Sequence, residues 1–162
     1  MEHTNIARAE QAYDAYAAQL YRVAYSLLQS RECAEDAVQD AFARYLAHDG
    51  HFRDGEHEKA WLIRVTVNAC RDLMRSFFRS RTISMEELNG WAPDITREKQ
   101  LVLEALWSLP KQYRDVIYLH FYEGYTAPEI AGILNRNPNT VYTHLRKGKE
   151  LLKEALGGAA DG

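Results

Sequence analysis

Two helix-start signals follow one another closely in the stretch YTAPEIAGILNRNPNTVYTHLRKGKELLKEAL, residues 125–156. Thr126 stands three residues before Glu129, so the hydroxyl and the carboxylate can each satisfy an open backbone N–H at a helix start. Asn137 followed by Pro138 repeats the signal, as a cap residue and a proline suited to the first helical position. Because the first helix must end before the second begins, this stretch can form only two helices joined by a tight turn.

The second of these helices has distinct inner and outer faces. Val141, Leu145 and Leu152 recur at helical spacing and predict a buried stripe. Seven polar, cationic or aromatic positions are left pointing outward: Asn139, Thr140, Tyr142, Thr143, Arg146, Lys147 and Lys149. Asn and Thr can read base edges in the major groove, while Arg and Lys hold phosphates. The pattern indicates a DNA-binding helix-turn-helix. The alternative at this point is a helical hairpin whose charged face is only solvated.

Helical periodicity without strand-like alternation continues through the rest of the chain and predicts an all-α fold. The first predicted helix buries Tyr13, Leu20 and Val23, and the helix after Pro110 buries Phe121. The segment TISMEELNGWAPDIT reads as a flexible linker. The predicted architecture is two small helical bundles, residues 1–80 and 98–162, joined by a linker over 81–97. Expected helices span about 6–28, 31–48 and 56–80, with further helices beginning near Leu101 and Leu109.

Charge is distributed unevenly in the first predicted bundle, although the net charge of the chain is only −3. Four arginines follow Lys59 in the helix over 56–80 and a fifth, Arg81, comes directly after it, while the only acid in that stretch is Asp72. The loop before it holds one aromatic and one cationic residue, Phe52 and Arg53. Such a surface can bind a phosphate backbone and trap an unpaired base. The helix over 31–48 is acidic instead, and DNA would repel it, so we expect it to contact a protein partner.

Several functional classes are disfavoured by the composition. Cys33 and Cys70 lack metal-ligand spacing, and we expect neither a metal nor a cofactor. No nucleophile–base pair or glycine-rich phosphate loop is present, so we do not expect an enzyme. No apolar run has the length of a membrane span, and the expected location is the cytoplasm. Hydrophobic residues make up 46% of the chain, which permits well-packed cores.

Three segments together resemble the bacterial extracytoplasmic-function sigma factors, the small members of the sigma-70 family that keep only the second and fourth conserved regions. They are LYRVAYSLLQSRECAEDAVQDAFARYL, FRDGEHEKAWLIRVTVNACRDLMR and ALWSLPKQYRDVIYLHFYEGYTAPEIAGILNRNPNTVYTHLRKGKELL, within residues 20–46, 52–75 and 105–152. The resemblance implies a region 2 domain over 1–80, a region 4 domain over 98–162 and promoter-specific transcription initiation. It also implies three partners: core RNA polymerase, promoter DNA and, in some members, an anti-sigma factor.

The resemblance also implies a role for particular residues. Asp36, Gln39 and Asp40 match the positions that dock on core RNA polymerase. The positions matching the minus-ten element surface are Phe52, Arg53, Arg64, Asn68, Arg71 and Arg75. The minus-thirty-five element would be read by the outward residues of the last helix: Asn139, Thr140, Tyr142, Thr143, Arg146, Lys147 and Lys149.

This chain departs from the family pattern in its last helix. Tyr142, Thr143 and His144 stand where Lys, Ser and Arg are usual, and Gly148 stands where a small alanine is usual. A glycine inside a helix costs about 1 kcal/mol relative to alanine. We expect His144 on the helix surface near DNA, and Trp61, in the first bundle, in the core.

Two other functions stay open on the sequence. One is a helix-turn-helix regulator that binds duplex DNA as a dimer, without polymerase. The other is a helical adaptor that binds only protein. Co-purification with core polymerase distinguishes them from a sigma factor.

Overall fold

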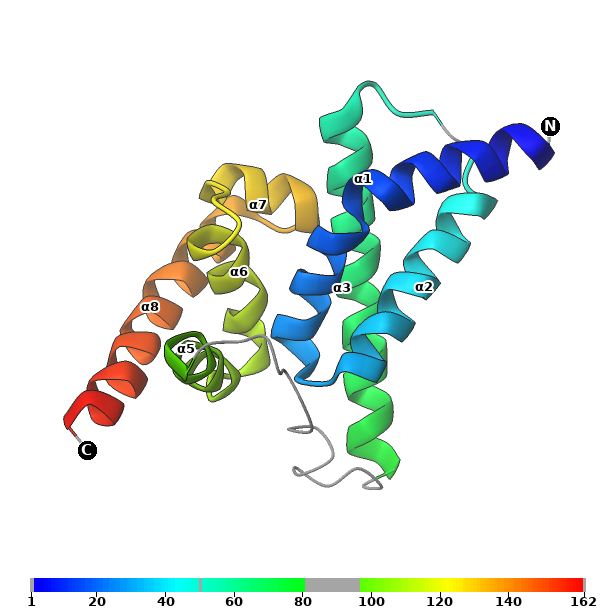
Figure 1. The fold of residues 1–162 in the computed structure, drawn as a ribbon. Helices are drawn as coiled ribbons and strands as arrows, with labels where there is room; N and C mark the ends of the chain where they lie inside the picture. The colour runs from blue at the N-terminus through cyan, green and yellow to red at the C-terminus, as the bar shows by residue number, and fades with distance from the viewer. Residues whose placement is uncertain (1, 50, 81–96, 162) are drawn as a thin grey trace. The chain divides into compact units, whose positions relative to one another are not determined.

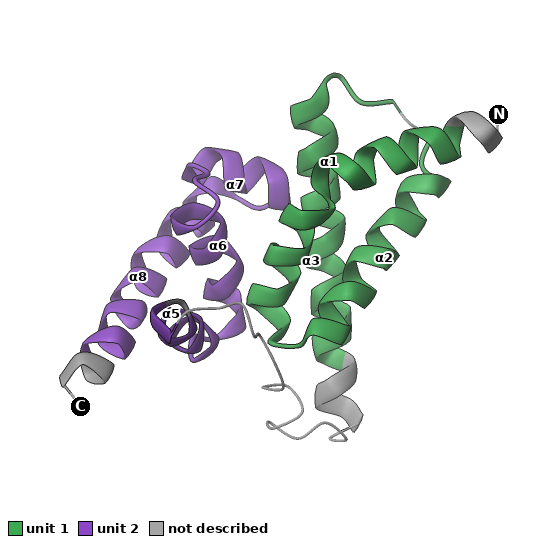
Figure 2. Cartoon of the chain, viewed as in Figure 1, with its two compact units in different colours: residues 1–90 green, residues 91–162 purple. Residues whose placement is uncertain are grey.

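The computed structural model describes residues 2–49, 51–80 and 97–161, and every regular element in these ranges is a helix. The helices are α1 (Glu2–Leu28), α2 (Arg31–Ala47), α3 (Gly55–Ser80), α5 (Arg97–Trp107), α6 (Lys111–Phe121), α7 (Ala127–Leu134) and α8 (Pro138–Asp161), as labelled in Figure 1. The predicted all-α fold is confirmed. The chain divides into two compact units, unit 1 (Met1–Gly90) and unit 2 (Trp91–Gly162), coloured separately in Figure 2. Apart from Arg97, which begins α5, the predicted linker over 81–97 lies outside the described residues.

Unit 1 is a three-helix bundle in which each helix packs against the other two. Leu20 and Val23 of α1 and Leu62 and Ile63 of α3 are almost completely buried in its core. The Ser30 hydroxyl accepts a hydrogen bond from the backbone N–H of Cys33 at 3.2 Å and so caps α2. The predicted start of this helix is therefore confirmed.

Two aromatic residues predicted to be buried are exposed instead. Tyr13 of α1 is 53% exposed and packs its ring against Phe42 of α2, with ring centroids 5.1 Å apart. Phe121 is the last residue of α6 and is 45% exposed, while Tyr118 one turn earlier is buried. Tyr118 can be buried because its hydroxyl donates to Glu123 at 2.8 Å. Helical spacing identified the apolar face, but it could not show where each neighbouring helix ends.

Unit 2 contains the predicted helix-turn-helix. Thr126 and Glu129 form the reciprocal capping box at the start of α7, and the Asn137 side chain accepts from the backbone N–H of Asn139 at 2.8 Å at the start of α8. Between them Asn135 adopts the left-handed conformation, with φ of 55°, which ends α7 and turns the chain. α8 packs against α5, α6 and α7, so it forms the centre of the unit.

Gly148 of α8 lies directly against α6. A β-carbon placed on Gly148 would come within 2.7 Å of Ile117 Cγ1 and 3.2 Å of Tyr113 Cβ. Real side chains do not approach to 2.7 Å, so an alanine here would force α6 and α8 apart or move Ile117. The departure from the family pattern at this position therefore has a packing function that helix propensity does not indicate.

We expect Gly148→Ala to destabilise unit 2 by about 1–2 kcal/mol, because overpacking costs more than the helix propensity of alanine returns. Gly132→Ala in α7 is the matched control, since no atom lies within 4 Å of a β-carbon built there. The control should stabilise α7 by about 0.5–1 kcal/mol. Hydrogen exchange of amides in α6, α7 and α8 measures both effects. If both substitutions stabilise the unit equally, α8 can move away from α6 without lowering the free energy of unfolding.

Candidate nucleic-acid interface

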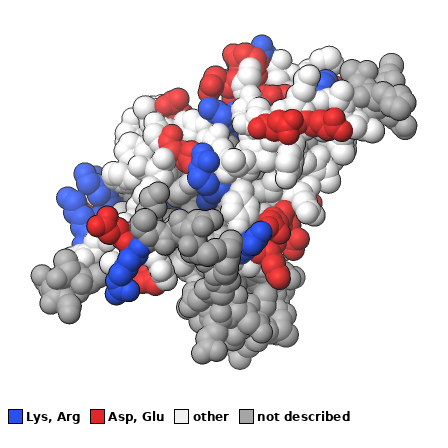
Figure 3. All heavy atoms as spheres, in the orientation of Figure 1, with Lys and Arg blue, Asp and Glu red and all other residues white. Residues whose placement is uncertain are grey.

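The exposed side of α2 carries the acidic residues singled out in the sequence. Asp36, Gln39 and Asp40 are all exposed. Asp40 accepts from Nε of Arg44 at 3.1 Å, whereas Asp36 has no ion pair within the described part of the chain. Figure 3 shows acidic side chains gathered over this helix. Because an adjacent arginine partly neutralises Asp40, Asp36 presents the stronger negative charge to a partner.

The loop between α2 and α3 is organised by stacked rings around Phe52. The Phe52 ring lies nearly parallel to that of His48, with centroids 4.8 Å apart and planes 10° apart. Tyr45 stacks at 5.9 Å, and Trp61 and His57 meet the Phe52 ring edge-on at 5.7 and 5.4 Å. Phe52 is therefore half-buried, while its neighbour Arg53 is exposed. The rings hold the loop in one conformation against the ends of α2 and α3.

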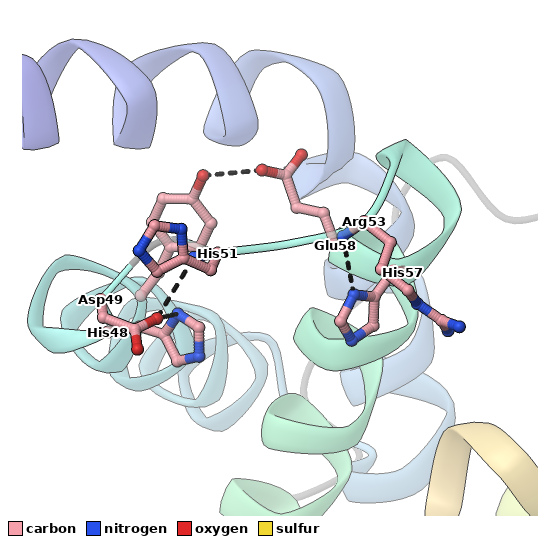
Figure 4. Close-up of polar contacts among 7 residues, drawn as sticks. His48, Asp49, His51, Arg53, His57 and Glu58 are labelled. Atoms are coloured by element: carbon pink, nitrogen blue, oxygen red, sulfur yellow. Dashed lines mark hydrogen bonds and ion pairs between the residues drawn. The ribbon is translucent and has the colours of Figure 1, made fainter.

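Polar contacts fix the same loop at both ends (Figure 4). The Asp54 carboxylate accepts from the backbone N–H of His57 at 2.8 Å and caps α3. The backbone N–H of Arg53 donates to Nδ1 of His57 at 3.0 Å. On the α2 side, the Tyr45 hydroxyl donates to Glu58 at 2.7 Å. Burial, and then the hydrogen bond to Glu58, raise the pKa of Tyr45, so the phenol remains a donor at neutral pH.

The predicted basic residues of α3 lie on one side of the helix. Arg64, Asn68, Arg71 and Arg75 follow one another at spacings of four, three and four, which places them on one face. Asn68 and Arg75 are exposed, and Arg64 and Arg71 are half-buried. Arg75 lies 3.9 Å from Asp72, a distant pair that leaves its positive charge accessible.

Trp61 joins this basic face to the loop. It was predicted to be a core residue, but it is half-buried, and its ring lies 4.7 Å from that of His48 as well as touching Phe52. Trp61 precedes Arg64 by three residues and so belongs to the same face as Arg64 and Asn68. That spacing could have identified it from the sequence. The structure thus joins Phe52 to the arginines of α3 through an aromatic residue.

All seven residues predicted to face outward on α8 are exposed: Asn139, Thr140, Tyr142, Thr143, Arg146, Lys147 and Lys149. Basic side chains gather over this helix in Figure 3. The Thr143 hydroxyl donates to the backbone carbonyl of Asn139 at 2.9 Å, so its oxygen remains available to accept. Tyr142 is 54% exposed, so its ring lies open to solvent on the outer face of α8.

His144 lies on a different side of α8 from these residues. Its ring meets that of Tyr113 of α6 edge-on, with centroids 5.4 Å apart, and its Nδ1 is buried. The predicted surface position is therefore only partly correct, because the residue is half-buried between α8 and α6. It occupies the same inner face as Val141, three residues before it.

An ion pair that sequence reasoning missed holds the turn before α8. Arg136, between α7 and α8, donates from both terminal nitrogens to the two carboxylate oxygens of Asp115 in α6. Asp115 is 3% exposed and Arg136 is 14% exposed. Nearby, Arg114 donates to the carbonyls of Trp107 and Leu109 and so closes the end of α5. Burial lowers the pKa of Arg114, but a guanidinium remains charged at neutral pH.

The described residues contain no group of three or more histidine, cysteine or acidic side chains able to hold a metal ion. In the same part of the chain, no helix combines the length and apolar character needed to cross a membrane. What the geometry does offer is two cationic surfaces, one in each unit, and an acidic surface on α2.

Comparison with known families assigns both units. Residues 12–81 match the family described as sigma-70 region 2, and residues 99–152 match the family described as sigma-70, region 4. The RNA polymerase sigma factor SigV of Bacillus subtilis is 31% identical over 139 residues, covering 84% of this chain and 83% of that protein. The ECF RNA polymerase sigma factor SigM of Mycobacterium tuberculosis is 28% identical over 151 residues, covering 91% and 76%.

Two solved structures share the fold. The sigma factor RpoE of Bartonella quintana, solved with the anti-sigma factor NepR, superposes with a TM-score of 0.73 at 24% identity, covering 91% of this chain and 96% of that one. CnrH, solved with the cytosolic domain of CnrY, gives a TM-score of 0.68 at 25% identity, covering 93% and 88%. With both regions present in order in one chain, and with relatives similar over most of their length, the protein belongs to the extracytoplasmic-function group of the sigma-70 family of RNA polymerase sigma factors.

Proposed function

We propose that this sigma factor divides its contacts among three surfaces, one for core RNA polymerase and two for promoter DNA. The acidic face of α2, formed by Asp36, Gln39 and Asp40, docks on core polymerase. Its exposure and its local negative charge support this assignment, because complementary charge steers and selects protein partners.

The loop over 48–54 and the basic face of α3 bind the minus-ten element. Arg53, Asn68 and Arg75 are exposed and can reach phosphates and bases, and Arg64 and Arg71 extend the same face. Phe52, with Trp61 beside it, offers a stacking surface to an unpaired base. Since Phe52 is already packed among protein rings, a base would stack on the remaining face of the cluster without opening the loop.

The outer face of α8 reads the minus-thirty-five element. The single observation that carries this assignment is that all seven outward residues of α8 are exposed on the second helix of a helix-turn-helix. Recognition helices of this kind meet base edges with their N-terminal residues and the backbone with the rest. Asn139, Thr140 and Thr143 thus read bases, and Arg146, Lys147 and Lys149 hold phosphates.

The protein works by binding, in the cytoplasm where its polymerase and promoters are, and an anti-sigma protein restrains it. Both solved neighbours were captured with other chains, an anti-sigma factor in one and the cytosolic domain of CnrY in the other, which supports a restraining partner here.

Co-purification with core RNA polymerase, followed by transcription from a promoter library with that core, tests the proposal. We expect a stable complex and initiation at a defined promoter class. Tight, specific duplex binding as a dimer without core would instead identify a regulator. Binding to protein alone, with no promoter selected, would identify an adaptor.

Substitutions at the two ends of the α8 surface should affect promoter binding in different ways. Asn139→Ala should change base preference at one or two promoter positions, by about 1–3 kcal/mol if the amide contact is bidentate. Lys147→Ala or Lys149→Ala should weaken binding to all promoters alike and lower the salt slope by roughly one unit for each phosphate that is no longer bound. Selection from a promoter library by holoenzymes that carry each substitution measures both effects. Changed base preference in the lysine variants would show that the ends are assigned in reverse.

A further inference from the structure

His57 contacts both loop residues assigned to the minus-ten element, Phe52 and Arg53. Neither the family resemblance nor the charge pattern gives it a role. Its Nδ1 accepts the backbone N–H of Arg53 at 3.0 Å (Figure 4). Its ring also meets that of Phe52 edge-on, with centroids 5.4 Å apart. Its own backbone N–H is held by the Asp54 carboxylate at 2.8 Å. One side chain therefore ties the loop to the first turn of α3.

This arrangement is a variant of the capping box. Asp54 is the N-cap residue, since its carbonyl accepts from Glu58 at 3.1 Å and its carboxylate accepts from His57, three residues on. In the usual box a Glu or Gln at that third position reaches back to a backbone N–H just before the helix. Here His57 does so with a ring nitrogen, and the N–H that it satisfies belongs to Arg53.

A ring nitrogen differs from a carboxylate or amide oxygen in one respect. Nδ1 can accept this hydrogen bond only while it carries no proton, which places the proton of the neutral ring on Nε2. When the imidazole is doubly protonated, both nitrogens are donors, and the Arg53 N–H then faces another N–H. Protonation would therefore release Arg53 and remove the contact that holds its side of the loop.

We propose that His57 is a positioning residue for the minus-ten loop, and that its neutral form holds Arg53 and Phe52 ready for DNA while its protonated form releases them. The inference rests on the proposed assignment of the loop to the minus-ten element. It adds a pH dependence to the loop, because only the neutral ring can accept the Arg53 N–H.

The surroundings of His57 contain charges of both signs. The charged and titratable groups near it on the loop, α2, α3 and the adjoining part of α1 include Arg53, Asp54, Glu56, Glu58, Lys59, His48, Asp49, His51, Tyr45, Tyr16 and Arg8. Because His48 also contacts the Phe52 ring, a wild-type pH profile alone would not identify His57.

Substitution of His57 by Gln separates the two histidines. Gln is a normal capping-box residue whose oxygen accepts at every pH. We expect wild-type holoenzyme to lose roughly two- to tenfold in affinity for a promoter fragment with a single-stranded minus-ten element between about pH 7.5 and about pH 5.5, the equivalent of one hydrogen bond. The His57→Gln holoenzyme should bind with nearly constant affinity over that range, and His57→Ala should be weak throughout.

His51→Gln is the matched control, because His51 lies in the same loop, is exposed and enters the polar contacts through its backbone N–H. It should keep the wild-type profile. A His57→Gln profile identical to that of wild type would overturn the proposal, and this comparison does not depend on whether His57→Ala folds. Arg75→Ala, tested alongside, distinguishes the two levels of inference. If it binds the minus-ten fragment normally, the surface assignment fails; if it is weak but His57→Gln follows wild type, only the role of His57 fails.

Discussion

The double substitution Asp36→Arg with Asp40→Arg should abolish co-purification with core RNA polymerase while leaving unit 1 folded. Both residues are exposed on α2, where charges contribute little to stability. At an interface selected by charge, juxtaposed like charges cost several kcal/mol. Pull-down of core enzyme by the tagged full-length variant measures the loss, and circular dichroism checks the fold.

The single substitutions should rank in a definite order. Asp40 already has Arg44 beside it at 3.1 Å, whereas Asp36 has no ion pair within the described residues. We therefore expect Asp36→Arg to weaken core binding more than Asp40→Arg. Glu10→Arg with Asp14→Arg is the matched control, since it makes the same charge change at exposed positions of α1. Equal loss in the control would mean that net charge, and not the α2 face, governs docking.

Arg136→Ala should destabilise unit 2 by about 3–5 kcal/mol, because it removes the positive charge that Arg136 holds against the buried carboxylate of Asp115. Asp115→Ala should cost less, since Arg136 is near the surface and its long side chain can turn toward water. Unfolding of unit 2, followed by hydrogen exchange of α6 and α8 amides, gives both values.

A double substitution tests whether the stability lost in Arg136→Ala comes from the buried charge of Asp115. Asp115→Leu with Arg136→Met should recover most of the stability, because apolar residues of similar size often replace a buried ion pair without loss. Arg31→Ala, which breaks an exposed pair with Glu35, should cost at most about 0.5 kcal/mol. If Arg136→Ala lowers the stability as little as this control does, other groups must stabilise the buried carboxylate of Asp115. The ion pair would then not be what holds the turn between α7 and α8.

The starts of α2, α7 and α8 and the outward face of α8 could be predicted from the sequence because they depend on local rules, whereas α5, expected to begin near Leu101, begins at Arg97. Thr126 with Glu129 and Asn137 cap α7 and α8 through hydrogen bonds within three residues, as predicted, and Ser30 caps α2 at its predicted start. Helical periodicity alone also separated the exposed residues of α8 from Val141. The capping hydrogen bonds and the exposed face of α8 depend only on residues close together in the sequence, and not on which helix packs against them.

The tertiary structure decided the features that depend on residues brought together from different elements. Arg136 and Asp115 are 21 positions apart, and no local pattern pairs them. Gly148 is unfavourable by helix propensity, yet the approach of Ile117 requires a residue without a β-carbon. Phe52 is half-buried because rings from α2 and α3 converge on it. Pairing, clearance and burial depend on how separate helices pack, and spacing along one helix does not specify which neighbour will face it.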